Sequence, residues 1–184
     1  MRRIDLPLPG SCLLEPRVHG DARGFFFEAW NERTLAELGI DARFVQENHS
    51  RSARGVLRGL HYQVPHAQGK LLRVLAGEIF DVIVDLRRAS ATFGQWHGMR
   101  LGTDSRQSLW VPIGFAHGFL VLSAFAEVLY SVTDYYRPQA EHALSWNDAA
   151  LNIAWPLAEA GVAAPVLSAK DVAGLALAAA PVFD

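Results

Sequence analysis

The sequence predicts a mainly β protein, a sandwich or barrel of antiparallel strands with a few short helices. Short apolar runs, broken by Gly, Pro, Asp and Asn, dominate from Leu13 to Trp155, as is typical of such folds. β-branched and aromatic residues within these runs suit a half-buried pleat. The 184 residues, 51% of them hydrophobic, have the length and composition of one globular domain covering residues 1–184.

The clearest strand signals lie in the middle of the chain. Segment 70–87, KLLRVLAGEIFDVIVDLR, indicates two strands joined at Gly77. In the second, one face would carry Ile79, Asp81, Ile83 and Asp85, and the other Phe80, Val82, Val84 and Leu86. Segment 107–136 predicts three more strands, with turns at PIG and SAFA.

Two segments favour helix. In NERTLAELG, Asn31 is a suitable N-cap, Leu35 and Leu38 share one face, and Gly39 is a stop signal. The Ala- and Leu-rich tail predicts a second helical segment over about 169–180, with Ser168 as its cap. The loop before it, AEAGVAAPVL, resembles a linker.

Composition excludes several classes of protein. A net charge of -2 gives no reason to expect nucleic acid or an acidic membrane as a partner. The lone Cys12 excludes an internal disulfide and a cysteine-based zinc site, which fits a reducing compartment. The N-terminus makes a poor signal peptide, and no apolar stretch approaches the length of a membrane span. We therefore expect a cytoplasmic protein.

The segment GLHYQVPHAQGK, residues 59–70, raises the choice between a metal site and a proton-transfer site. The glycine-rich turns and the segment PIGFAH, which contains His117, resemble the sequence pattern of the cupin barrels. The metal site of a cupin also needs an H-x-H pair. Here HYQ places Gln63 where the second histidine belongs, and glutamine is a weak ligand for transition metals. Lys70 would repel a cation, and His66 follows Pro65 as a turn residue. The sequence predicts a site without metal.

The remaining groups suit acid–base chemistry. His61 is a candidate base, Lys70 would stabilise an oxyanion, Tyr130 would donate a proton, and Asp171 would orient the histidine. These groups fit proton abstraction beside a carbonyl and reprotonation on the other face, which is epimerisation without a cofactor. Taken alone, each also has a structural explanation: core packing, a solvated lysine, or a carboxylate favoured at a helix start.

Blocks along nearly the whole chain resemble the dTDP-4-dehydrorhamnose 3,5-epimerase family. In order they are RGFFFE, GVLRGLHYQ, AQGKLLRV, GEIFDVIVDLR, SATFGQW, LWVPIGFAHGFLVL, YSVTDYYRP and LSAKD. The resemblance implies a metal-free cupin-type jelly-roll barrel, and a homodimer that exchanges N-terminal strands. It implies His61 as base, Asp171 as its partner, Tyr130 as acid and Lys70 as the enolate-stabilising cation.

The resemblance also implies a binding site for a dTDP-4-keto-6-deoxyglucose. Its expected members are Arg23, Glu28, Gln46, Asn48, Arg58, His117, Glu141 and Lys170. The Arg58 guanidinium is suited to forked contacts with phosphate oxygens. Phe26 and Tyr136 are candidates for stacking on thymine, with barrel packing as the equal alternative.

Two other functions stay open from the sequence. A relative that epimerises carbon 3 or carbon 5 alone would share His61, Lys70 and Tyr130. A cupin-like module that only binds a nucleotide sugar is the other, although binding alone requires neither a base nor an acid. The number of carbons that exchange hydrogen with solvent discriminates among the three.

Overall fold

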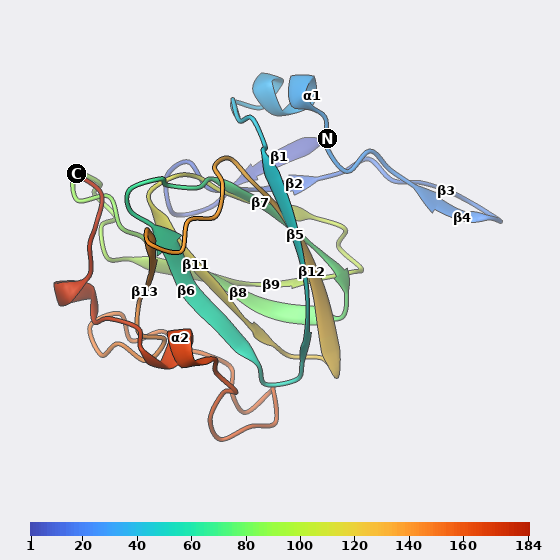
Figure 1. The fold of residues 1–184 in the computed structure, drawn as a ribbon. Coiled ribbons are helices and arrows are strands. Elements are labelled where there is room, and N and C mark those ends of the chain that lie inside the picture. The colour runs from blue at the N-terminus through green and yellow to red at the C-terminus, as the bar shows by residue number, and fades with distance from the viewer.

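The computed structural model describes all residues 1–184 and is built mainly from antiparallel strands (Figure 1). The strands are β1 (Arg2–Asp5), β2 (Cys12–Glu15), β3 (His19–Asp21), β4 (Gly24–Phe26), β5 (Gln46–Ala53), β6 (Leu57–Gln63), β7 (Lys70–Ala76), β8 (Glu78–Asp85), β9 (Trp96–Gly102), β10 (Ser108–Val111), β11 (Phe115–Val121), β12 (Phe125–Val132) and β13 (Glu141–Ala143). One sheet has the order β1-β2-β10-β7-β12-β5, and the other β13-β6-β11-β8-β9. The predicted fold class is confirmed.

The main core lies between these two sheets. It joins inward side chains of β7, β8, β10, β11 and β12, among them Leu72, Val74, Ile79, Ile83, Leu109, Phe119 and Val128. The opposite face of β8 is also buried, because the C-terminal segment covers it: Val82 and Val84 pack with Leu144 and Leu151. Burial on both faces explains why β8 carries apolar side chains on both faces.

Gly77 joins β7 and β8 as predicted, but at a corner between the sheets rather than in a hairpin. Its φ of 77° lies in the left-handed region, and a Cβ there would sit 2.0 Å from the carbonyl oxygen of Phe125. Only glycine tolerates both constraints. The three strands expected over 107–136 are β10, β11 and β12, with the turns where they were predicted.

The first helix is confirmed and the second is shorter than expected. Helix α1 (Glu32–Glu37) is capped by Asn31, whose side chain accepts from the Thr34 N–H, and it buries Leu35. In the tail, α2 spans only Ala169–Val172, and a 3-10 turn, η1, follows at Leu177–Ala179. The expectation of helix over 169–180 was wrong because Leu175 pairs with the backbone of β13 instead. No helix here has the length and apolarity to cross a bilayer.

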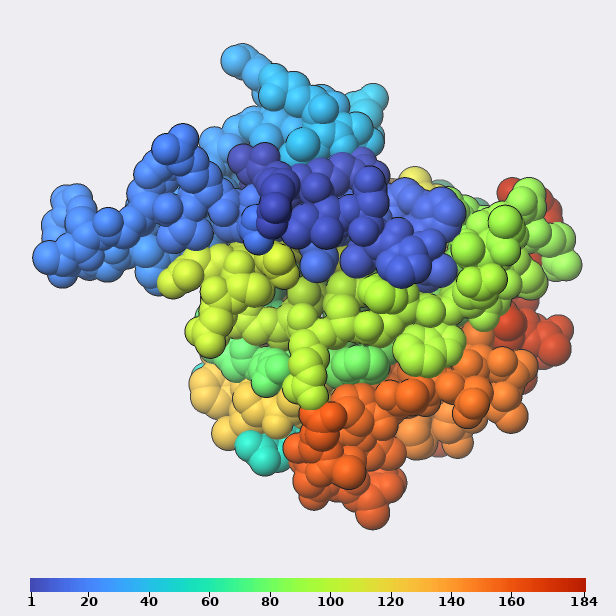
Figure 2. Space-filling model, turned by 180° about the vertical axis from the view of Figure 1, so that it is seen from behind, coloured from blue at the N-terminus to red at the C-terminus, as the bar shows by residue number.

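The β3–β4 hairpin projects from the body of the molecule (Figures 1 and 2). The two strands pair only with each other. On β4, Phe25 and Phe26 are 62% and 72% exposed, and the guanidinium of Arg106 lies 4.4 Å from the Phe25 ring centre. These side chains form an exposed apolar surface on the arm.

The buried carboxylate at the end of β8 should contribute to stability. Asp85 accepts hydrogen bonds from Arg87, Ser90 and Thr92. Burial raises its pKa, but these donors outweigh burial and hold the pKa at about 2. The stabilisation is therefore complete above the unfolded pKa of about 4 and disappears as pH falls towards 2.

We expect Asp85→Asn to lower the free energy of unfolding by about 2 kcal/mol at pH 7. The difference from wild type should shrink steadily between about pH 4 and pH 2. Denaturant unfolding at several pH values measures it. A destabilisation that stays constant down to pH 2 would contradict this account of Asp85.

Candidate active site

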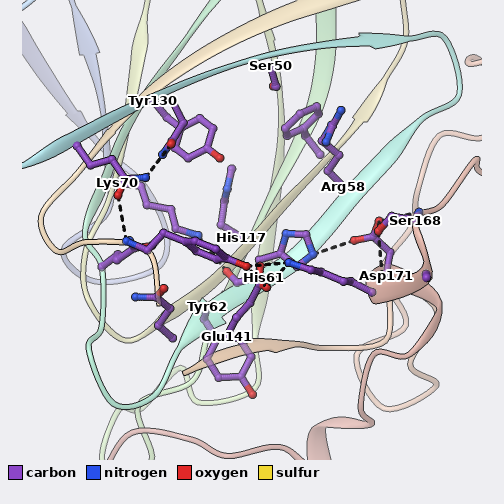
Figure 3. Close-up of a pocket in the computed structure, with 18 residues that line it drawn as sticks. Ser50, Arg58, His61, Tyr62, Lys70, His117, Tyr130, Glu141, Ser168 and Asp171 are labelled. Atoms are coloured by element: carbon purple, nitrogen blue, oxygen red, sulfur yellow. Dashed lines mark hydrogen bonds and ion pairs between the residues drawn. The ribbon is translucent and has the colours of Figure 1, made fainter. Parts of the chain in front are cut away.

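A cavity of about 640 Å³ opens between the two sheets (Figure 3). Strands β5, β7 and β12 line one side, β6, β11 and β13 line the other, and α2 closes one end. Its lining residues are Gln46, Asn48, Ser50, Arg58, His61, Tyr62, Gln63, Gln68, Lys70, His117, Phe119, Tyr130, Tyr136, Glu141, Ser168, Ala169, Lys170 and Asp171. The structure therefore brings together most of the residues predicted from the sequence.

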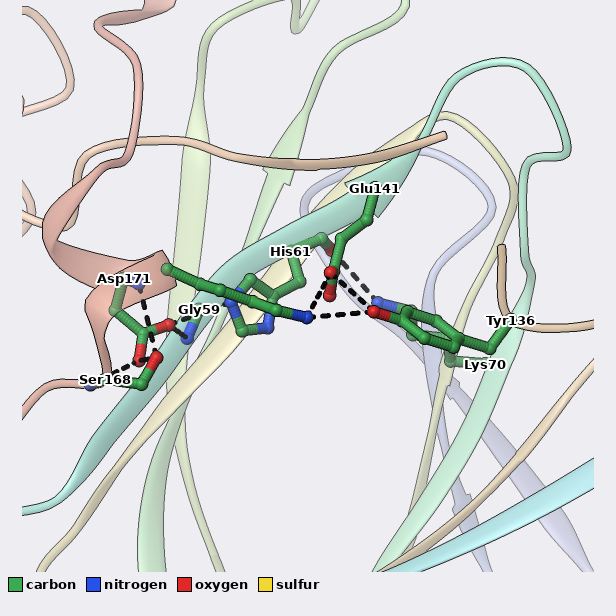
Figure 4. Close-up of polar contacts among 8 residues, drawn as sticks. Gly59, His61, Lys70, Tyr136, Glu141, Ser168 and Asp171 are labelled. Atoms are coloured by element: carbon green, nitrogen blue, oxygen red, sulfur yellow. Dashed lines mark hydrogen bonds and ion pairs between the residues drawn. The ribbon is translucent and has the colours of Figure 1, made fainter. Parts of the chain in front are cut away.

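His61 and Asp171 meet although they come from distant parts of the chain. Nε2 of His61, on β6, lies 2.8 Å from Oδ1 of Asp171, on α2 (Figure 4). The oxygen lies off the ideal direction of the ring N–H, so the contact is best described as an ion pair. The His61 side chain is 30% exposed in the cavity, and that of Asp171 only 2%.

The carboxylate of Asp171 is kept ionised in spite of its burial. Burial raises its pKa, but the contact with His61 and the hydrogen bonds from Ser168 and the Gly59 N–H outweigh burial, so the pKa lies well below its usual value. The ionised carboxylate lies directly beside the imidazole ring of His61. This is the arrangement expected of a histidine that accepts a proton and holds it for part of a cycle.

A close approach of two strands places His61 beside His117. Gly59 has a φ of 127°, and a Cβ there would lie 2.4 Å from the Gly118 Cα. Glycine at both positions lets β6 and β11 come together, and His61 and His117 are direct partners in that pairing. Both side chains line the cavity.

Lys70 and Tyr130 come from the sheet opposite His61. Lys70 Nζ donates to the backbone oxygen of His61 at 3.0 Å, and the residue is 7% exposed. Burial lowers the pKa of Lys70 to about 8, against the fields of Asp81 and Glu141. Burial raises the pKa of Tyr130, partly offset by Arg58. At neutral pH the cavity thus holds a buried ammonium and a protonated phenol across from the histidine.

Asp81 is a residue whose part in the site the sequence did not reveal. Its Oδ2 lies 2.8 Å from Nε2 of His117, and its side chain is fully buried. Its Oδ1 has no hydrogen-bond donor. The available signal was an acid within the apolar run of β8, on the same face as Ile79 and Ile83. That pattern assigned it to a face of the strand but gave it no partner.

Polar pairs line the mouth of the cavity. Lys170 contacts both Glu141 and the hydroxyl of Tyr136, which itself donates to Glu141 at 2.8 Å (Figure 4). These bonds outweigh burial and lower the pKa of Glu141. On β5, Gln46 donates to Asn48 at 2.8 Å. Nε of Arg58 donates to Ser52 at 2.8 Å, so its terminal nitrogens are left for a ligand.

Three predicted ligand residues do not reach this cavity. Arg23 lies on the projecting hairpin and pairs with Asp21, and its side chain is 90% exposed. Phe26 is on the same hairpin, and Glu28 accepts a hydrogen bond from Asn31 after the hairpin. None of the three lines the cavity of its own chain.

Gln63 has a structural task in this site. Its side-chain nitrogen donates to the backbone oxygens of His66 and Tyr135, and its oxygen accepts from the Arg137 N–H. His66 has a φ of 69° in the turn after Pro65 and pairs with Asp134 outside the cavity. No three His, Cys, Asp or Glu side chains are grouped as metal ligands would be. The metal-free site stays a prediction, which metal analysis before and after chelator treatment checks.

The fold is a cupin-type barrel, and the groups in its cavity are those of an acid–base enzyme. Residues 5–179 match the sequence model of the dTDP-4-dehydrorhamnose 3,5-epimerases. The chain belongs to this family of isomerases.

Individual relatives agree with this assignment. The dTDP-4-dehydrorhamnose 3,5-epimerase of Pseudomonas aeruginosa is 55% identical over 184 residues, which cover 100% of this chain and 99% of the relative. The crystal structure of the Legionella pneumophila 3,5-epimerase with dTDP-4-keto-L-rhamnose has a TM-score of 0.92 and 48% identity, covering 98% of this chain and 94% of that one. A 3'-monoepimerase of Streptomyces bikiniensis, solved with dTDP-quinovose, has a TM-score of 0.87 and 32% identity, covering 95% and 87%.

Proposed function

We propose that this protein is a dTDP-4-dehydrorhamnose 3,5-epimerase. It inverts carbons 3 and 5 of dTDP-4-keto-6-deoxy-D-glucose and gives dTDP-4-dehydro-L-rhamnose for dTDP-L-rhamnose biosynthesis, without a cofactor. The observation that carries the proposal is the placement of His61 and Tyr130 on opposite sheets of one cavity. A base and an acid on opposite faces of a sugar ring are what inversion at carbon requires.

The 4-keto group makes both neighbouring C–H bonds acidic. His61 takes the proton from one carbon, and the electron pair moves into an enolate whose oxygen is stabilised by the ammonium of Lys70. Tyr130 then delivers a proton to the opposite face of the same carbon, and solvent restores both groups. The cycle repeats at the second carbon. With Nε2 facing Asp171, Nδ1 of His61 is the nitrogen that accepts the proton.

The mouth of the cavity suits the nucleotide diphosphate. Arg58 and His117 are placed to hold the phosphates or the sugar, and Tyr136 offers a face for thymine. Gln46, Asn48, Glu141 and Lys170 supply polar groups around them. These local charges meet an anionic ligand although the whole chain is nearly neutral.

We also propose that the enzyme works as a homodimer in which each hairpin reaches the partner's cavity. This accounts for the exposed Phe26 and for the distance of Arg23 and Glu28 from their own cavity. The buried, free Cys12 suits a reducing compartment, and we place the enzyme in the cytoplasm.

A complementation experiment tests the shared site. We expect Arg23→Ala to raise KM roughly tenfold, because one phosphate contact is worth about 1.5–3 kcal/mol, and His61→Ala to be inactive. When the two variants are mixed and allowed to exchange subunits, one cavity of each hybrid dimer should have a near-wild-type KM. A hybrid dimer then holds one cavity with both residues intact. If mixing restores nothing while sedimentation shows that hybrids form, Arg23 does not serve the partner's cavity.

The central experiment is incubation of the protein with dTDP-4-keto-6-deoxyglucose in heavy water, followed by NMR. Deuterium at both carbon 3 and carbon 5 is the expected result. Incorporation at one carbon only would instead identify a monoepimerase, such as the Streptomyces bikiniensis relative. No incorporation, with dTDP still bound, would reduce the protein to a binding module.

A further inference from the structure

Ser168 holds the carboxylate of Asp171 in the orientation that faces His61. Its backbone N–H donates to Oδ2 at 2.9 Å, and its hydroxyl donates to the same oxygen at 2.6 Å. The Gly59 N–H donates to Oδ1 at 3.1 Å (Figure 4). Ser168 thereby fixes Oδ2, and Oδ1 is turned towards the imidazole ring.

The direction of the hydroxyl proton follows from a second contact. The Asp171 N–H donates to Oγ of Ser168 at 3.3 Å, which completes a capping box at the start of α2. Because the oxygen accepts this bond, its single proton is free to point at Oδ2. One hydroxyl therefore begins the helix and orients the carboxylate.

The backbone around Ser168 is anchored independently of that hydroxyl. Before α2, Val166 exchanges hydrogen bonds with Gly55 and Leu57 at the start of β6, at 2.8 and 3.0 Å. After α2, the Leu175 N–H donates to Ala143 of β13 at 2.8 Å. Both strands belong to the sheet that carries His61. With the backbone tied on both sides, the freedom that the hydroxyl removes is rotation of the Asp171 side chain.

We propose that Ser168 is a positioning residue for epimerisation, acting through Asp171 on the basicity of His61. This inference rests on the proposed function, because it requires His61 to act as the base. Without the hydroxyl, only the backbone N–H groups of Ser168 and Gly59 hold the Asp171 carboxylate, so it is freer to turn away from the ring. His61 then loses the nearby negative charge that stabilises its protonated form, and it becomes a weaker base.

The test compares Ser168→Ala, Ser168→Thr and the control Ser145→Ala. Ser145 also donates one side-chain hydrogen bond, to Asn147, but lies outside the cavity. Rates of deuterium incorporation from heavy water into dTDP-4-keto-6-deoxyglucose are measured across pH. We expect Ser168→Ala to lower kcat roughly tenfold, to leave KM within about twofold, and to move the acidic limb of the kcat profile to lower pH. Threonine keeps the hydroxyl, so Ser168→Thr should have a near-wild-type kcat and an acidic limb at the wild-type pH.

Two results would overturn the inference. One is a wild-type rate in Ser168→Ala. The other is a lower rate in Ser168→Ala without a shift of the acidic limb of its kcat profile. That result would mean that loss of the cap only destabilises the fold. Failure of the proposed function is distinguishable from both, since the wild-type protein itself would then incorporate deuterium at one carbon only or at neither.

Discussion

Replacing His61 with alanine should lower the rate of epimerisation by roughly 10³-fold, the typical size of a general-base contribution. No other group in the cavity replaces it, because the neighbouring His117 is paired with the buried Asp81. Deuterium incorporation at both carbons should fall together, since one base serves both. The affinity for dTDP, measured by calorimetry, should stay close to that of wild type.

A histidine from the same segment of the sequence is the control for this prediction. His66 lies five positions further on and pairs with Asp134 outside the cavity. His66→Asn preserves a residue that tolerates its φ of 69° and should keep near-wild-type activity. Equal losses in the two variants, or a wild-type rate in His61→Ala, would refute His61 as the base.

Lys70→Met should separate catalysis from stability. The side chain keeps its approximate length but loses the charge that stabilises the enolate, so kcat should fall by about 10²–10³. We expect the wild-type rate to decline near pH 8, where Lys70 loses its proton. This alkaline decline should be absent from Lys70→Met. Steady-state kinetics from pH 6 to about pH 10 measures both effects.

The same variant should be the more stable protein at neutral pH. Burial lowers the pKa of Lys70 from 10.5 to about 8, so the native ammonium is destabilising below pH 8. The wild type recovers that stability between pH 8 and 10.5, where only the unfolded state keeps the proton. We expect the free energy of unfolding of Lys70→Met to be about 2 kcal/mol higher than that of wild type at pH 7. This difference should shrink above pH 8. A less stable variant at pH 7 would contradict an unfavourable burial of the charge.

Features that depend on neighbouring residues could be predicted from the sequence. The strands 70–76 and 78–85, the cap at Asn31 and the turn at Gly77 have signals in residues next to one another. The prediction of a helix over 169–180 was wrong because a contact with a distant segment outweighs the local preference. Alanine and leucine favour helix locally, but the backbone of Leu175 instead completes the pairing of β13, a contact that only the folded chain defines.

The candidate site divides along the same line. His61 and Lys70 belong to one short segment, and Asp171 was a candidate partner for the histidine from its place at the predicted helix start. The partnership of Asp81 with His117 required the register of the strands, and the contact of His61 with Asp171 required the path of the tail. The distance of Arg23 from the cavity of its own chain follows from the path of the projecting hairpin, which no pattern of neighbouring residues defines.

The division of His61 and Tyr130 between two sheets has a consequence for the handedness of the product. The separation of the two sheets is set by the core layer packed between them, which includes Leu72 and Ile83, and that separation fixes the distance from His61 to Tyr130. Thinning the layer would alter the path of the returning proton while every reacting group remained in place. Fidelity of inversion is thus a property of the packing, and retained configuration after exchange would be its first sign of failure.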